Sequence, residues 1–253
     1  MRARAAILVA IAFALTPPSL GRAARPDADA LLRAAYDNWR AKSSTSDITM
    51  TVHRPDWERS MEMKAWTRGD EDALVRFVAP AKDAGNATLK TRDETWVFNP
   101  KLNQVIKLPA SMLAQSWMGS DFSYNDLSKA DDILVKYTHR LLSSEKANGH
   151  MVYTIEAIPK PDAPVVWGKQ IVKVREDGVM LGETYYDQDM KIVRQMVTDR
   201  VGPIGGRDYP VVMTMRPVDE PQKWTRIETK SAQFNITLPA YLFTLSNLQN
   251  PRD

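Results

Sequence analysis

The feature that most constrains the fold is a change of hydrophobic period soon after residue 41. From Ile48 onward, apolar and polar side chains alternate along short segments, and these segments end at turn residues such as those at 54–56 (Arg-Pro-Asp) and 176–178 (Glu-Asp-Gly). A period of two residues is that of a strand with one buried face. Short turns between such strands join antiparallel neighbours. The sequence therefore predicts an antiparallel meander.

We expect about ten or eleven strands, and a sheet of so many strands curls or closes. The chain shows no internal repeat, no low-complexity tract and no linker. Residues 27–41 form an amphipathic pattern whose apolar stripe includes Leu32, Tyr36 and Trp39, and residues 109–118 predict a second, short helix. The fold class is thus mainly β (α+β), one strongly curved sheet whose concave face the two helices cover as a lid or plug.

Residues 1–24 have the pattern of a secretory signal peptide. Two arginines precede an apolar run over residues 5–15, and small residues follow. The run is too short to span a membrane, so we expect cleavage after Ala23 or Ala24 rather than an uncleaved anchor. The three arginines of this segment account for the whole net charge of +3. The rest of the chain is neutral, without a basic run that would favour nucleic acid.

The sequence contains no cysteine. The exported protein therefore has no disulfide, and it has no thiol that could be acylated to make it a lipoprotein. A single domain over residues 25–253 must be stabilised by its own core, and that length is within the range of one large β domain. We expect a periplasmic protein without a lipid anchor.

Recognisable catalytic motifs are absent from the sequence. The histidines His53, His139 and His150 lie on separate predicted strands, and there is no HExxH, G-x-S-x-G or phosphate-binding loop. Zinc binding by cysteine and histidine is not indicated. We therefore expect neither a metal nor a cofactor, and a protein that is not an enzyme.

The central stretch Met118–Leu127 predicts a long loop braced by its own side chains. Gly119 is a turn residue, and serine and aspartate side chains can cap backbone N–H groups. Loops of this length are usually functional, although a well-formed crossover is the alternative. The residues assigned to a lid and its hinge, from both predicted helices and this stretch, are Leu32, Tyr36, Trp39, Met112, Leu113, Trp117, Met118, Ser120, Asp121, Phe122 and Asp126.

Methionine is unusually frequent in the predicted strands, which normally favour β-branched residues. The chain has 12 methionines. Methionine adapts to varied apolar partners, so these residues predict either an ordinary core or the wall of an apolar cavity. On the cavity interpretation the lining residues are Ile48, Met50, Val52, Met61, Met63, Phe77 and Val97.

The order and spacing of several segments resemble the outer-membrane lipoprotein-sorting proteins of the LolA-like superfamily. The resemblance extends over nearly the whole chain after the signal peptide. The segments that carry it are 63–69 (Met-Lys-Ala-Trp-Thr-Arg-Gly), 75–80 (Val-Arg-Phe-Val-Ala-Pro), 85–89 (Gly-Asn-Ala-Thr-Leu), 95–100 (Thr-Trp-Val-Phe-Asn-Pro), 118–127 and 238–248.

The resemblance implies an incomplete antiparallel β-barrel closed by helices, with an apolar cavity for acyl chains. It implies a carrier that moves lipoproteins or other lipids between the inner and outer membranes without covalent chemistry. Its partners would be the acyl chains, an inner-membrane transporter of the ABC or RND type and an outer-membrane acceptor, and we expect a monomer. An arginine on an early strand fastens the lid of the best-known carrier; Arg54 and Arg59 are both candidates here.

Two other functions stay open at this stage. The same cavity could belong to a sensing or interaction domain that reports lipid or lipoprotein to an inner-membrane transporter or regulator. An enzyme acting on lipid or glycan would need an acidic pair, for which Asp121 and Asp126 are the candidates.

Overall fold

The computed structural model describes residues 26–252, so the predicted signal peptide lies outside the described residues. The strands are β1 (Ser43–Arg54), β2 (Trp57–Arg68), β3 (Asp72–Ala79), β4 (Ala87–Thr91), β5 (Glu94–Asn99), β6 (Gln104–Lys107), β7 (Tyr137–Ala147), β8 (His150–Pro159), β9 (Lys169–Arg175), β10 (Met180–Tyr186), β11 (Ile192–Ile204), β12 (Arg207–Pro217) and β13 (Trp224–Phe234). The helices are α1 (Ala28–Arg40), η1 (Ala110–Met112), α2 (Tyr124–Ser128), α3 (Asp132–Lys136), η2 (Ala240–Phe243) and α4 (Leu245–Gln249).

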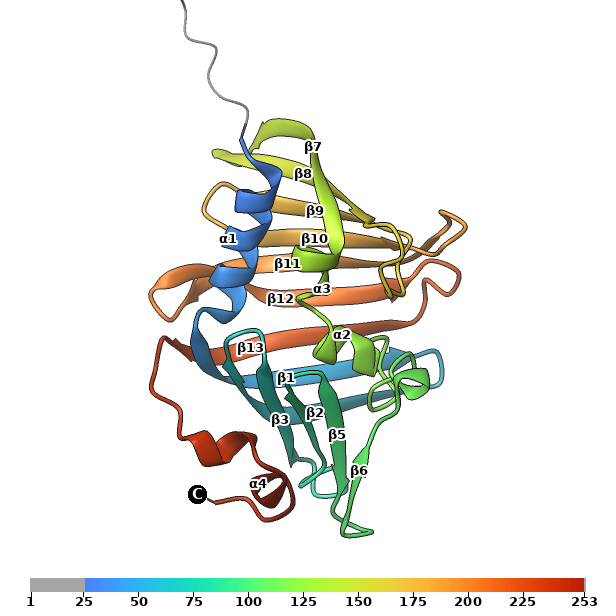
Figure 1. The fold of residues 1–253 in the computed structure, drawn as a ribbon, viewed down its shortest axis with the longest axis vertical. Helices are drawn as coiled ribbons and strands as arrows, with labels where there is room; N and C mark the ends of the chain where they lie inside the picture. Colours follow the sequence, from blue (N-terminus) through green and yellow to red (C-terminus); the bar gives the residue numbers. More distant parts are fainter. Residues whose placement is uncertain (1–25, 253) are drawn as a thin grey trace, which may run out of the picture.

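The strands form a single antiparallel sheet in the order β6-β5-β4-β3-β2-β1-β13-β12-β11-β10-β9-β8-β7. Its edges, β6 and β7, do not pair, so the curved sheet is an incomplete barrel, as the sequence and the resemblance predicted. Figure 1 shows β3, β5 and β6 running steeply against the direction of the other strands, which makes one face concave. The sheet has thirteen strands, where ten or eleven were expected, and the shortest of them is the four-residue β6.

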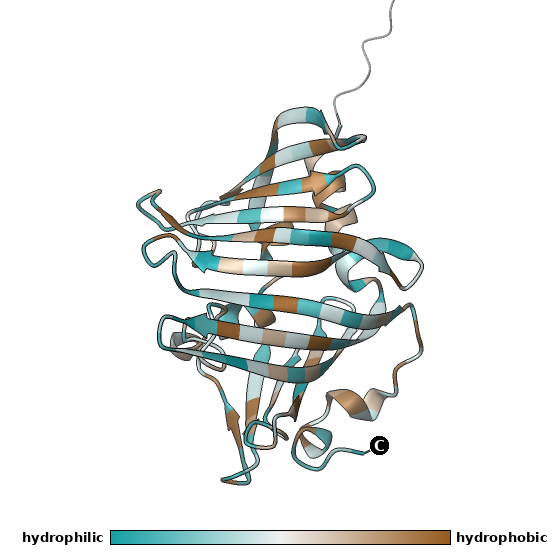
Figure 2. Cartoon of the chain, turned by 180° about the vertical axis from the view of Figure 1, so that it is seen from behind, coloured by the Kyte–Doolittle hydropathy of each residue, from teal (hydrophilic) through white to brown (hydrophobic). Residues whose placement is uncertain are grey.

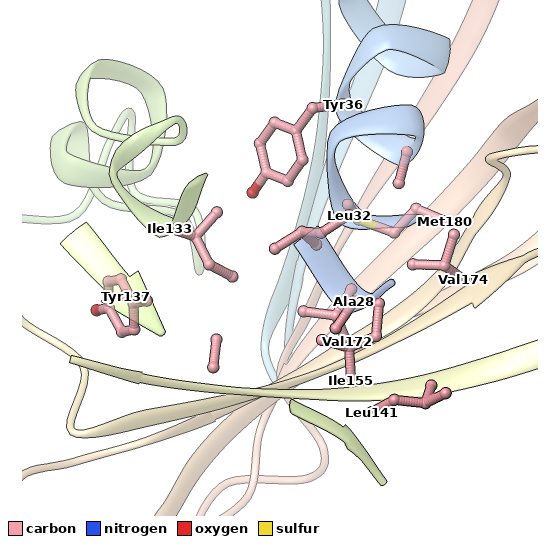
Figure 3. Close-up of a cluster of buried hydrophobic side chains, with 12 residues drawn as sticks. Ala28, Leu32, Tyr36, Ile133, Tyr137, Leu141, Ile155, Val172, Val174 and Met180 are labelled. Atoms are coloured by element: carbon pink, nitrogen blue, oxygen red, sulfur yellow. The ribbon is translucent and has the colours of Figure 1, made fainter. Parts of the chain in front are cut away.

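Helix α1 crosses the concave face of β7–β12, as its apolar stripe predicted (Figure 1). Asp27 caps it by accepting a hydrogen bond from the Asp29 backbone N–H at 3.1 Å. Leu32 is fully buried against the strands. Figure 3 shows Leu32 and Tyr36 facing a cluster that includes Ile133 of α3 and Val172 of β9.

The prediction of a helix over residues 109–118 is wrong. Only the single 3-10 turn Ala110–Met112 forms there, without a side-chain cap, and the chain then continues through turns. A regular short helix lies instead inside the predicted loop, at Tyr124–Ser128. A capping box stabilises its start: Ser123 and Asp126 each accept a hydrogen bond from the backbone N–H of the other.

The C-terminal segment, residues 238–250, covers the opposite, convex face of β3–β6. Its Leu242, Phe243 and Leu248 pack on Leu74 and Leu89, whose sequence neighbours face the concave side. Figure 2, which views the molecule from behind, shows this segment beside the steep strands and no helix in front of β7–β12. No helix within residues 26–252 is long and apolar enough to cross a membrane.

Candidate functional site

A cavity of about 250 Å³ lies between the concave face of the sheet and the elements that cover it. We call it the central cavity. Its floor comes from both halves of the sheet and its roof from α1, the segment Trp117–Leu127, α2 and α3. Most of the lining is apolar, and the apolar residues that the argument uses are Ile48, Met63, Ala65, Val75, Met196 and Ile227.

Some of the predicted lining residues border the central cavity, and the others do not. Ile48 and Met63 border the central cavity, and they are neighbours across β1 and β2. A second set is buried beneath the 117–127 segment and packs into a core without bordering the cavity: Met50, Val52, Met61 and Phe77. Val97 is half-buried on β5 opposite Thr88 and does not border it either.

Trp117 anchors the segment that roofs this second set. Its side chain is buried, and its ring lies 5.3 Å from that of Phe77, centroid to centroid. The indole Nε1–H donates a hydrogen bond to the Thr88 hydroxyl at 3.2 Å. Ser120 closes the turn that follows, since its hydroxyl donates to the Trp117 carbonyl at 2.6 Å. The aromatic anchor and the turn together shield the methionines of β1 and β2 from solvent.

Arginines from three strands fasten the same segment to the sheet. Arg54 of β1 donates to the Asp121 carboxylate at 3.1 Å and to the Gly119 carbonyl at 2.8 Å. Arg59 of β2 donates to the Met118 carbonyl. Both arginines proposed from the sequence therefore contact the segment, and they do so at adjacent points.

Arg194 of β11 is the third arginine, and the sequence analysis missed it. It donates to the Asp121 carbonyl at 2.9 Å and to the Asp126 carboxylate. The side chains of Arg194 and Asp126 are almost fully buried. Its guanidinium also lies over the rings of Trp167 and Tyr185, 4.6 and 4.5 Å from their centroids. Arg194 lies two residues before the cavity residue Met196 on the same strand, so the two side chains share a face. An arginine on an otherwise apolar strand face was the sequence signal that could have identified it.

The remaining predicted lid residues lie in different environments. Tyr36 and Trp39 of α1 border the central cavity, whereas Leu32 is in the core beneath the helix. Met112 and Leu113 are half-buried at the 3-10 turn and border no part of the cavity. Among the lid residues of the 117–127 segment, only Trp117, Phe122 and Asp126 reach the cavity, and Met118, Ser120 and Asp121 fix the segment from outside it.

Glu183 of β10 is a buried carboxyl on the cavity wall, and the sequence analysis missed it as well. Burial raises its pKa to about 7, while the hydrogen bond from the Tyr185 hydroxyl at 2.8 Å and the nearby Arg194 oppose that rise. Desolvation disfavours the charged form of an acid, which is the cause of the shift. A register shift in β10 between Met180 and Gly182 turns Glu183 to the same side as Met180.

The acidic pair considered for catalysis is engaged in structural contacts. Asp121 accepts hydrogen bonds from Arg54 and from the Thr225 hydroxyl, and Asp126 accepts them from Arg194 and from Ser123. Within the described part of the chain, no three histidine or acidic side chains are placed to hold a metal ion. The arrangement is that of a binding cavity with a fastened cover.

Comparison with known proteins agrees with this geometry. A family model described as an uncharacterized protein matches residues 69–250. No curated protein matches the sequence. Among solved structures, a DUF1329 family protein from Desulfovibrio piger is 23% identical, with a TM-score of 0.77, and the match covers 87% of this chain and 97% of that one.

Two further structures carry names that bear on the resemblance. A putative outer membrane lipoprotein-sorting protein domain from Vibrio parahaemolyticus is 19% identical, with a TM-score of 0.75 and coverage of 88% and 98%. A LolA superfamily protein from Nitrosomonas europaea is 20% identical, with a TM-score of 0.72 and coverage of 87% and 98%. These matches confirm the resemblance to the LolA-like superfamily at the level of the fold.

Proposed function

Because the chain belongs to the family of uncharacterized proteins whose model it matches, and because it has the LolA-like fold, we propose that it is a non-catalytic periplasmic carrier of acyl chains. It takes up lipoproteins or other lipids at the inner membrane and delivers them to the outer membrane. Residues 1–24 direct export, and residues 25–253 form the carrier domain. The observation that carries this proposal is the central cavity, an apolar space under a fastened cover.

The energy of burying an acyl chain suits such a carrier. Each buried methylene contributes about 0.8 kcal/mol, so about ten of them contribute about 8 kcal/mol. Association costs about 4–15 kcal/mol in lost rigid-body freedom. One chain therefore gives weak binding and two chains give firm binding. A carrier must hold its cargo in water and still release it, so its affinity has to lie between these two cases.

The central cavity is small for a carrier of whole lipids. Its volume of about 250 Å³ is below the range of about 300–1,000 Å³ that is usual for sites enclosing a whole small ligand. A complete lipid therefore requires the cover to move. We infer that the 117–127 segment is the part that moves, because the hydrogen bonds and ion pairs that fasten it to the sheet can be replaced by water.

Loading and release then depend on partners that favour the open form. An inner-membrane transporter of the ABC or RND type would present the cargo, and an outer-membrane acceptor would take it. A partner shifts the balance between closed and open forms only by binding one of them more tightly than the other. Transfer in one direction requires the acceptor to bind the cargo or the open carrier better than the transporter does.

Native mass spectrometry of the protein purified from its own periplasm, with lipid extraction, tests the proposal. We expect a bound species bearing one or more acyl chains. A lipid-free protein that also takes up no added lipid would overturn the carrier function and favour an interaction domain.

A pair of methionine variants tests the cavity as the binding site. Met63→Glu places a charge on the cavity wall and should abolish uptake of a fluorescent fatty acid. Met190→Glu makes the same change at a half-exposed turn and should leave uptake unchanged. Should Met63→Glu fail to fold, Ala65→Phe fills the cavity without a charge and should reduce uptake. Wild-type uptake by folded Met63→Glu or Ala65→Phe contradicts the site.

A further inference from the structure

A polar row crosses the floor of the central cavity at one end. Ser44, Thr67, Ala73, Lys90 and Thr95 are successive partners across the five strands β1 to β5. Residues directly opposite one another in antiparallel strands share a face, so these side chains point the same way. All five border the central cavity. One end of the floor is therefore lined by hydroxyl groups and an ammonium group.

The opposite end of the same floor is apolar. Ile48 and Met63 are partners of each other, and each lies four residues along its strand from the polar row. Four residues of strand span about 13 Å. The row between the two ends mixes hydroxyl and small apolar side chains, namely Ser46, Ala65, Val75 and Thr88. The floor thus changes from polar to apolar over a distance that suits an amphiphile lying along the strands.

Buried charge at the polar end is unbalanced. Arg40 of α1 and Lys90 of β4 both contact the carboxylate of Asp131, and the side chains of all three are only about a tenth exposed. Lys90 lies 3.6 Å from that carboxylate and donates to the Asp70 carbonyl, and Arg40 also donates to the Gly69 carbonyl at 3.0 Å. Two buried cations therefore share one buried anion.

Lys90 and Arg40 can each donate further hydrogen bonds. An ammonium and a guanidinium have more N–H groups than these contacts use. Burial lowers the pKa of the Lys90 ammonium although Asp131 opposes the effect, as expected for a cation whose partner is shared. Asp131 stands at the start of α3 but accepts no helix N–H, so its role at this end is electrostatic.

The other charged groups that border this end are already paired. Lys129 lies 3.5 Å from the exposed Asp93, and Asp132 accepts a hydrogen bond from Lys136 at 2.9 Å. Each of these two pairs is neutral in itself, and so is the pair of Asp126 with Arg194. Glu183 also borders the cavity, and burial raises its pKa to about 7. The excess positive charge at the polar end therefore lies with Arg40 and Lys90.

We propose that Arg40, Lys90 and the polar row bind the anionic headgroup of the carried lipid, a phosphate ester or a carboxylate. The acyl chains extend along β1 and β2 toward Ile48 and Met63. The inference rests on the proposed carrier function and sharpens it, because it assigns the cargo to anionic lipids. An entering anion supplies the second negative charge that two buried cations require.

Calorimetric titration with lipids of equal chain length tests this site. Dioctanoyl phosphatidylglycerol is compared with dioctanoylglycerol, and dodecanoate with dodecanol, all below the concentrations at which they aggregate. We expect wild-type protein to bind the anionic member of at least one pair about tenfold more tightly or better. The pair with the larger preference distinguishes a phosphate from a carboxylate headgroup.

Three variants link that preference to the buried charges. Lys90→Met should abolish most of the preference through weaker binding of the anionic lipid, with binding of the neutral lipid retained. Lys173→Met removes an exposed charge on the convex side of β9 and should leave the preference intact. Asp131→Asn removes the shared anion and should increase the preference, which gives a second readout of opposite sign if Lys90→Met fails to fold.

The outcomes separate the headgroup site from the carrier function. Equal binding of charged and neutral lipids by the wild type, or a preference unchanged in both Lys90→Met and Asp131→Asn, overturns the headgroup site and leaves the carrier intact. Failure to bind any of the four lipids overturns the carrier function itself.

Discussion

The concave face of the sheet is covered in two different ways. Over β7–β12, α1 packs through apolar side chains such as Leu32 and Ala35, which are fully buried. Over β1–β3, the 117–127 segment has one deep aromatic anchor, Trp117, with partly buried apolar side chains beside it, and arginines from three strands also hold it. Apolar packing can be broken only by exposing the core to water, whereas water molecules can replace the partners in a hydrogen bond or ion pair.

Under the proposed carrier function, this difference gives the two covers separate roles: α1 stays in place with the core, and the 117–127 segment is the cover that opens. Opening that segment would expose Met50 and Met61 and enlarge the central cavity toward them. The methionines that do not border the cavity in the closed form would then line it in the open form.

Leu32→Ala should have the largest effect. The side chain is fully buried beneath α1, and truncation of a buried leucine typically costs about 2–5 kcal/mol. Calorimetry should show a lower Tm for global unfolding. Arg33→Ala, on the exposed side of the same helix, is the control and should change stability little. A Leu32→Ala protein with wild-type Tm would mean that α1 is not part of the core.

Arg194→Met should loosen the 117–127 segment more than the protein as a whole. Breaking its buried pair with Asp126 costs about 3 kcal/mol or more, which increases opening about a hundredfold. Hydrogen exchange should speed up over residues 117–127 and stay slow over α1.

The matched control for that variant is Arg200→Met, on the same strand but in an exposed pair with Glu228. It should leave exchange unchanged. Equal acceleration over α1 and the segment in Arg194→Met would show that the two covers open together.

Glu183→Gln should stabilise the protein at alkaline pH by about 3 kcal/mol, since a pKa raised from 4.5 to about 7 corresponds to about 1.4 kcal/mol for each pH unit. The folded pKa of about 7 exceeds the ordinary 4.5, so the folded state binds the proton more tightly. The resulting contribution to stability is complete below about pH 4.5 and is lost as the pH rises through 7. Replacement by a neutral amide removes this loss.

Thermal unfolding from pH 4 to pH 8 measures the effect as a difference between variant and wild type. We expect no difference near pH 4 and a higher Tm for Glu183→Gln at pH 8. Glu62→Gln, at an exposed position of β2, is the control and should follow the wild type. A constant difference at all pH values would show that Glu183 is not the titrating group.

Ser123→Ala should have the smallest effect, about 1 kcal/mol, through loss of the cap of α2. Hydrogen exchange should increase at the start of that helix only. Ser123→Thr retains a hydroxyl that can accept from the Asp126 N–H and donate to the Asp126 carboxylate, and it should restore protection. Without such rescue, the serine acts through packing and not as a cap.

The features that could be predicted from the sequence are those whose physical cause is local. Strand alternation, turn residues and the apolar stripe of α1 depend on neighbours within a few positions, so they predicted a curved antiparallel sheet with a helix on its concave face. The capping role of Ser123 and Asp126 was readable for the same reason. The helix expected at 109–118 failed because the apolar spacing there had no capping side chain to support it.

Which side chains come into contact across the molecule depends on the complete fold. Arg194 is far in sequence from Asp121 and Asp126, and Arg40 and Lys90 share Asp131 from elements that are distant along the chain. Such encounters depend on the register of thirteen strands and on the curvature of the whole sheet, and no local pattern encodes them. Sequence periodicity therefore could not predict where the charges lie in the cavity, although it did predict which face of each strand is apolar.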